Sequence, residues 1–219
     1  MDADEAWETV DRRRARLADV LTELSPEEWA RPSLCEGWTV RDVAGHLTMA
    51  ALRPAQMLGL LLRHPGGTNR LIRDGSIDLA RRNPPQRLVE QIRGLIGNHR
   101  PIPGLSVRES LIDIVGHTLD IVIPLDREHA IAPVEAAEAA DGVVGYGGRG
   151  KAKVFRQLPM DGLRLVATDH DWSNGTGHDV NAAMTDLFLL LTGRTARVAA
   201  LEGPGASILR DRLGDRIRR

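Results

Sequence analysis

The histidines and carboxylates that could hold a metal ion fall in two apolar stretches of this sequence. Of its seven histidines, His46 and His117 lie among aliphatic residues in segments with a helical pattern. Imidazole nitrogens on the inward face of a helix need partners, because a buried polar atom without one is costly. Asp113 precedes His117 by four residues and Asp120 follows it by three. These spacings place the three side chains on one helix face.

This arrangement is one by which helical bundles supply two metal ligands from one helix and a third from another. His46 is the candidate for the third ligand, because it lies about two turns into its own helix. Two imidazoles and one carboxylate leave coordination positions open. That set suits Zn²⁺, Ni²⁺ or Fe²⁺ better than Ca²⁺ or Mg²⁺. Asp120 is either a further ligand or an acceptor that fixes the tautomer of His117.

Two simpler interpretations of the same residues stay open. Asp113 and His117 have the spacing of an ordinary ion pair on a helix. Alternatively, His46, Asp113 and His117 form a buried hydrogen-bond network that holds no metal. In that case Asp113→Ala should destabilise the fold equally with and without a chelator, because it leaves a buried imidazole unpaired.

Capping boxes predict where the helices that carry these residues begin. Thr39-Val-Arg-Asp42 opens one helix and Ser106-Val-Arg-Glu109 opens the other. Pro54 should kink or break the first of them. Short connections between apolar periodic segments predict an antiparallel bundle in this part of the chain. The expected helices cover residues 4–24, 39–62, 69–82, 86–96, 106–123 and 133–146.

The character of the sequence changes after the glycine-rich segment Gly145–Gly150. Residues 163–169 are rich in strand formers, and we expect helices over 180–191 and 206–213. We therefore predict a mainly α fold with a small α+β part. A four-helix bundle would cover residues 1–147, and a small α+β C-terminal domain would cover 148–219.

Composition and charge exclude several classes of function. The 29 Lys and Arg residues nearly balance the 30 Asp and Glu residues, for a formal net charge of −1. A general nucleic-acid binder or a protein of membrane surfaces would carry a basic excess, so we expect neither partner. No apolar run is long enough to span a bilayer. The single cysteine, Cys35, excludes an intrachain disulfide and fits the cytoplasm; we expect it to be a packed loop residue.

Several segments resemble the mycothiol-dependent maleylpyruvate isomerase family, which belongs to the wider DinB/YfiT-like metal-binding bundles. Residues 33–47, SLCEGWTVRDVAGHL, are similar to the signature of the family's second helix. Residues 113–125, DIVGHTLDIVIPL, are similar to a second signature, with Asp113 where the isomerase has Glu and Ile-Pro-Leu where the family has Arg-Pro-Leu. Residues 162–172 and 189–194 resemble the family's small C-terminal domain.

The resemblance implies a DinB-like bundle that holds a divalent metal, usually zinc, through His46, Asp113 and His117. It also implies mycothiol, the low-molecular-weight thiol of actinobacteria, as co-substrate. The expected activity is thiol-dependent isomerisation or transfer on an electrophilic small molecule. Arg194 is the match for a catalytic arginine of the C-terminal domain, although it also fits a charge at a helix end. The alternative is a non-catalytic metal- or ligand-binding bundle that oligomerises, for example as a homodimer.

Overall fold

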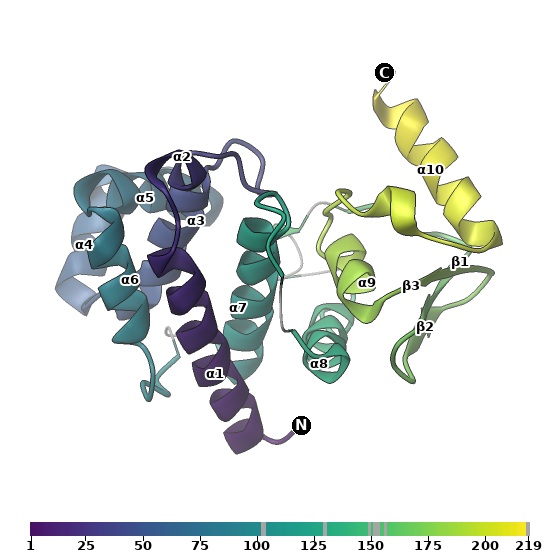
Figure 1. Cartoon of the computed structure of the whole chain (residues 1–219), viewed down its shortest axis with the longest axis horizontal. Coiled ribbons are helices and arrows are strands. Elements are labelled where there is room, and N and C mark those ends of the chain that lie inside the picture. Colours follow the sequence, from purple (N-terminus) through teal and green to yellow (C-terminus); the bar gives the residue numbers. More distant parts are fainter. Residues whose placement is uncertain (102–103, 129–130, 149, 151–153, 156, 218–219) are drawn as a thin grey trace. The chain divides into compact units, whose positions relative to one another are not determined.

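The described residues form two compact units, 1–129 and 130–219 (Figure 1). The computed structural model describes residues 1–101, 104–128, 131–148, 150, 154–155 and 157–217. We expected the domains to meet between residues 147 and 148. The helix α8 (Pro133–Val144) instead groups with the second unit, because its alanine-rich face packs against α9 (Met184–Leu191).

The first unit is a helical bundle in which two helices face each other across the candidate metal ligands. In this unit α1 packs against α6 and α7, and α3 packs against α5, α6 and α7. Fully buried aliphatic side chains such as Val10, Leu17, Val43 and Leu119 line these contacts. The described helices of the unit are α1 (Ala3–Thr22), α2 (Pro26–Trp29), α3 (Val40–Leu47), the 3-10 turn η1 (Thr48–Ala51), α4 (Pro54–Arg63), α5 (Thr68–Arg82), α6 (Pro85–Arg93) and α7 (Val107–Val122).

The helix ends follow the local sequence signals. The Thr39 backbone N–H donates to the Asp42 carboxylate at 2.9 Å, and the Asp42 N–H donates back to the Thr39 hydroxyl. The same reciprocal arrangement opens α7 at Ser106. The segment 39–62 is broken ahead of Pro54, because a residue before proline is disfavoured in helical conformation. Arg53 is accordingly extended, and Pro54 becomes the first residue of α4.

One glycine allows α3 and α5 to approach closely behind His46. A Cβ atom at Gly45 would lie 2.6 Å from the backbone oxygen of Ser76 and 2.9 Å from the Ala80 side chain. Real Cβ atoms do not approach backbone oxygen this closely, so a larger residue would push the helices apart. Gly45 therefore brings Ser76 of α5 within reach of the imidazole next along α3.

The second unit contains a three-stranded sheet with helices packed against it. The strands β1 (Leu163–Ala167), β2 (Ser173–Gly175) and β3 (His178–Ala182) have the order β2-β1-β3, antiparallel for β1–β2 and parallel for β1–β3. Helix α9 packs on β1, and α10 (Pro204–Ile217) packs on β3. The short 3-10 turn η3 (Val198–Ala200) lies between α9 and α10.

The start of the expected helix 180–191 was wrong. Residues 178–182 form β3, because this segment pairs with β1 along its whole length, Leu165 opposite Val180. The helix begins only at Met184, whose backbone N–H donates to the Asp169 carboxylate at 2.8 Å. With this correction, the predicted mainly α fold with a small α+β part is confirmed.

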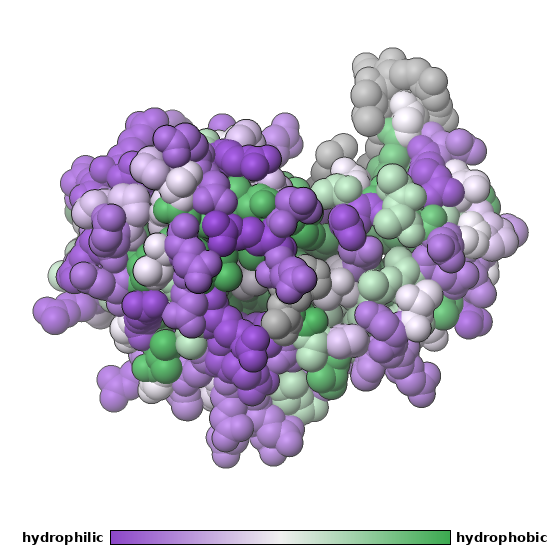
Figure 2. Space-filling view, in the orientation of Figure 1, coloured by the Kyte–Doolittle hydropathy of each residue, from purple (hydrophilic) through white to green (hydrophobic). Residues whose placement is uncertain are grey.

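The surface of the first unit is mostly hydrophilic on the face that Figure 2 draws. Among the described residues, no helix has both the length and the apolar character needed to cross a membrane.

Candidate metal centre

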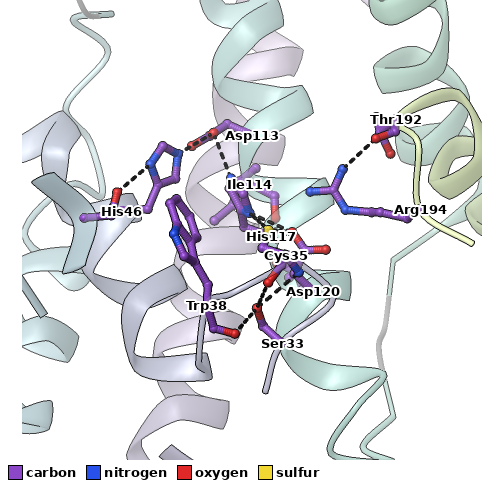
Figure 3. A network of polar contacts seen from close by, with 12 residues as sticks. Ser33, Cys35, Trp38, His46, Asp113, Ile114, His117, Asp120, Thr192 and Arg194 are labelled. Atoms are coloured by element: carbon purple, nitrogen blue, oxygen red, sulfur yellow. Dashed lines mark hydrogen bonds and ion pairs between the residues drawn. The ribbon is translucent and has the colours of Figure 1, made fainter. Parts of the chain in front are cut away.

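The predicted ligands His46, Asp113 and His117 lie together between α3 and α7 (Figure 3). Asp113 Oδ1 is 3.1 Å from His46 Nε2 and 3.4 Å from His117 Nε2. Each of the three side chains offers one ligand atom, and these three atoms all lie within 4.8 Å of one another. The two imidazole rings meet edge to face, with centroids 4.6 Å apart. The structure thus places on one spot the residues that the sequence placed on two helices.

A serine behind His46 is placed to accept a hydrogen from one of its ring nitrogens. Ser76 Oγ lies 3.3 Å from His46 Nδ1 and donates its own hydrogen to the Ile72 carbonyl oxygen one turn earlier. A hydroxyl has a single hydrogen, so toward His46 the Ser76 oxygen is an acceptor. This arrangement favours His46 Nδ1–H as the donor, and with an ion bound the Nε2 lone pair would be free to ligate it beside Asp113.

A buried carboxylate plays the same part behind His117. Asp120 has a fully buried side chain, and its Oδ2 lies 2.8 Å from His117 Nδ1. A carboxylate accepts, so His117 donates from Nδ1, and with an ion bound its Nε2 lone pair would be free to ligate. Carboxylate acceptors behind metal-bound imidazoles fix the tautomer and raise the basicity of the ligand.

Two imidazole nitrogens and a carboxylate that converge on one point attract a cation. Ligand atoms about 2.1 Å from a tetrahedral zinc ion are about 3.4 Å from each other. The observed separations of 3.1 and 3.4 Å from Asp113 Oδ1 are close to this spacing. The donor set, its tautomers and its spacing therefore fit a divalent metal ion of the zinc type.

In the metal-free protein a proton supplies that positive charge. Burial alone would lower the pKa of His117, but the Asp113 carboxylate outweighs burial and raises this pKa well above its usual range. Burial would likewise raise the pKa of Asp113. The nearby imidazoles of His46 and His117 outweigh it and hold that pKa well below its usual range. Metal and protons thus compete for the same atoms.

The centre is open on one side and walled on another. The Asp113 side chain is 44% exposed, whereas those of His46 and His117 are 15% and 13% exposed. The indole of Trp38 lies against both imidazoles, with ring centroids 5.5 Å from His46 and 6.4 Å from His117. An ion held here would keep a position accessible to small molecules, as catalytic metal sites do.

A second cluster shares His117 but is less suited to an ion. Cys35 Sγ, His117 Nδ1 and Asp120 also lie within 4.8 Å of one another. The Cys35 thiol donates to Asp120 Oδ2 at 3.0 Å, the same oxygen that accepts from His117. An ion there would have to displace both hydrogens at a fully buried carboxylate. The cluster with solvent access, around Asp113, is the better candidate.

Sequence reasoning did not find three residues of this site. It treated Cys35 as loop packing, and it gave no role to Trp38 or Ser76. Ser76 comes from a helix whose sequence carries no signal for the site, and only the close approach at Gly45 brings it to His46. The position of Cys35 four residues before a capped helix with a histidine is the one available hint.

Arg194 lies in the second unit, just after α9. Its guanidinium donates to the Thr192 carbonyl oxygen at 3.3 Å (Figure 3). This is the contact expected of a basic residue at the carboxyl end of a helix. Its catalytic role stays a prediction.

Comparison with known proteins agrees with the sequence resemblance. Residues 10–100 match the family model described as the mycothiol maleylpyruvate isomerase N-terminal domain. The predicted family resemblance is confirmed. The matched segment contains His46, Cys35, Trp38 and Ser76, and ends before Asp113.

Two solved structures share the fold. One is the mycothiol-dependent maleylpyruvate isomerase, with 12% identity and a TM-score of 0.54 over 89% of this chain and 90% of that chain. The other is a histidine-to-alanine mutant of the mycothiol-dependent maleylpyruvate isomerase, with 12% identity and a TM-score of 0.57 over 87% and 89% of the two chains. No curated protein sequence matches the chain. At this identity the likeness establishes the fold and leaves the reaction to the chemistry of the site.

Proposed function

We propose that this chain is a metal- and thiol-dependent enzyme that isomerises an electrophilic small molecule, or transfers a thiol to it, with mycothiol as the thiol. The observation that carries the proposal is the convergence of the Nε2 atoms of His46 and His117 on the Asp113 carboxylate. The match of residues 10–100 to the mycothiol maleylpyruvate isomerase N-terminal domain supports the choice of thiol. Cytoplasmic location remains the expectation from the sequence.

The residues of the first unit supply binding and orientation. His46, Asp113 and His117 would hold the divalent ion, with zinc as the first choice. Such an ion lowers the pKa of a bound thiol, so that the reactive thiolate forms near neutral pH. Asp120 and Ser76 keep both imidazoles in the ligating tautomer. Trp38 covers one side of the imidazole pair and limits access of water from there.

The second unit would contribute Arg194. A guanidinium is permanently charged and forms paired hydrogen bonds with carboxylates, so it suits a substrate that carries one. Under this proposal Arg194→Ala leaves zinc affinity unchanged and reduces thiol-dependent turnover. A change in zinc affinity equal to that of His46→Ala would contradict this assignment.

The decisive experiment measures metal content and thiol binding together. Protein purified without a histidine tag should contain near one zinc per chain, and His46→Ala and His117→Ala should lose it. His99→Ala is the matched control, because His99 pairs with Asp11 on α1 and is not one of the predicted ligands. With zinc bound, mycothiol at about 100 times its Kd should stabilise the protein by about 2.7 kcal/mol.

Each failure points to a different alternative. Zinc without any shift at millimolar mycothiol would contradict the thiol assignment and favour a non-catalytic metal-binding bundle. If the protein holds no metal after reconstitution, and Asp113→Ala destabilises the fold equally with and without a chelator, the three residues form only a hydrogen-bond network.

A further inference from the structure

Cys35 forms a hydrogen bond with Asp120, on the side of His117 that faces away from the proposed metal. Its thiol donates to Asp120 Oδ2 at 3.0 Å, and that oxygen accepts the Nδ1 hydrogen of His117 at 2.8 Å (Figure 3). The sulfur itself lies 3.9 Å from His117 Nδ1. A continuous chain of contacts therefore runs from the thiol through a buried carboxylate to the imidazole whose Nε2 faces Asp113.

The loop that carries Cys35 is anchored to the same residue a second time. The Leu34 backbone N–H donates to the backbone oxygen of Asp120 at 3.1 Å. Within the loop, the Ser33 hydroxyl donates to the Trp38 carbonyl oxygen and accepts from the Cys35 backbone N–H. The loop thus joins α7 at Asp120 to the residue that lies against both imidazoles, Trp38, and then to the start of α3.

We propose that Cys35 is a positioning residue of the metal centre. Its S–H fixes the Asp120 carboxylate, and Asp120 in turn fixes the ring and tautomer of His117. The inference rests on the proposed metal site and adds to it a residue that never touches the ion. Outer hydrogen-bond partners of metal-bound histidines commonly change metal affinity by about 10–100-fold, and a residue one bond further out should act at the low end of that range.

The geometry separates this role from direct ligation. His117 presents Nε2 to Asp113 and Nδ1 to the Cys35–Asp120 pair, so the two sets lie on different edges of the ring. A sulfur bound to the same ion as His117 Nε2 would have to leave Asp120 and cross to the opposite edge. Cys35 therefore acts on the ligand and leaves the open position to an incoming thiol.

The test compares Cys35→Ala with Cys35→Ser in the full chain. Co²⁺ and Zn²⁺ affinities are measured by chelator competition, together with the visible spectrum of the Co²⁺ form, which reports the geometry of the ion. We expect Cys35→Ala to weaken both affinities about 10-fold and to change the cobalt spectrum. Cys35→Ser keeps a donor and should restore most of the affinity. Thr118→Ala is the matched control, because it deletes a buried hydrogen bond of α7, to the Ile114 carbonyl oxygen, that does not involve His117.

Five results would overturn the inference. Cys35→Ala could bind both ions as tightly as the original chain does. Cys35→Ser could lose as much affinity as Cys35→Ala, which would indicate that Cys35 acts through packing alone. Thr118→Ala could also lose as much affinity, which would indicate a general loss of stability. A sulfur-to-cobalt charge-transfer band would instead make Cys35 a ligand, and the assignment is unambiguous because the chain has one cysteine. An original chain that binds neither ion would refute the proposed function itself, and this inference with it.

Discussion

Asp113→Asn separates a metal centre from a hydrogen-bond network, because it keeps the shape of the side chain and removes its charge. In the metal-free protein the lost interaction is the pair between Asp113 and protonated His117. Two unit charges 3.4 Å apart attract by about 5 kcal/mol at an effective dielectric constant of 20. Asp113 is 44% exposed, so solvent screening should reduce the measured loss of unfolding free energy to about 1 kcal/mol.

The zinc-loaded protein should show a much larger difference. At a free zinc concentration of about 100 times its Kd, the original chain gains about 2.7 kcal/mol of stability. If the loss of one ligand raises the Kd about 100-fold, the same zinc concentration adds only about 0.4 kcal/mol to Asp113→Asn. The zinc-induced rise in Tm should therefore shrink from about 5–11 °C to about 1–2 °C, at about 2–4 °C per kcal/mol.

Thermal unfolding followed by tryptophan fluorescence measures the loss of stability in EDTA and the zinc-induced gain in zinc. Trp38 is one of four tryptophans in the chain and lies against both imidazoles, so part of the emission comes from the centre. Asp78→Asn is the matched control, since the ion pairs of Asp78 among the described residues are with one histidine, His64 at 3.5 Å, and with Arg63 and Arg82. If zinc raises the Tm of Asp113→Asn as much as that of the original chain, the metal centre is refuted. If the substitution lowers the Tm equally in EDTA and in zinc, the site is a hydrogen-bond network.

Three further predictions follow from the same contacts. In EDTA, the Asp113 carboxylate stabilises the fold fully above about pH 4, and this contribution is lost as the pH falls through its lowered pKa. Protonated His117 stabilises the fold fully below about pH 6.5, and this contribution is lost as the pH rises through its raised pKa. The stability difference between the original chain and Asp113→Asn, measured by urea unfolding, should thus peak between about pH 4 and 6.5 in EDTA. With zinc the same difference should grow toward pH 8, because the imidazoles must release protons to bind the ion. Asp120→Asn should lower zinc affinity about 10–100-fold by disturbing the acceptor of His117 Nδ1, and chelator competition that shows no change would contradict the role given to Asp120. Gly45→Ala should cost about 1–3 kcal/mol in urea unfolding because its Cβ meets the Ser76 backbone; Gly59→Ala, whose Cβ meets only the end of Arg63 at 3.9 Å, should be neutral or stabilising by about 1 kcal/mol.

Local sequence signals predicted most helix ends but not where a segment joins a distant partner. Capping boxes at Thr39 and Ser106 and the proline at 54 act within a few residues, so they could be read directly from the sequence. Residues 180–182 were predicted as the start of a helix over 180–191, because their apolar residues continue into α9. They became part of a strand because β1, more than ten residues away in the chain, offers the strand a complete set of backbone partners.

The same division applies to the site. The spacing of Asp113, His117 and Asp120 on one helix was visible in the sequence, and so was a histidine at a similar depth on another helix. The tautomers were not visible, because they depend on Ser76 from a third helix and on a loop that folds back onto α7. The donor set was visible in the sequence, and the structure adds the acceptor that lies behind each imidazole.

The shorter carboxylate at position 113 is compatible with the metal, although the resembling isomerase has Glu there. The concern is reach, since aspartate has one methylene fewer than glutamate. Asp113 Oδ1 nonetheless lies 3.1 and 3.4 Å from the two Nε2 atoms, which is near the spacing of donors around a tetrahedral ion. Because Asp113 and His117 are one turn apart on α7, the backbone already brings the carboxylate to the imidazole. The aspartate therefore reaches the position where an ion would bind without any movement of α3 or α7.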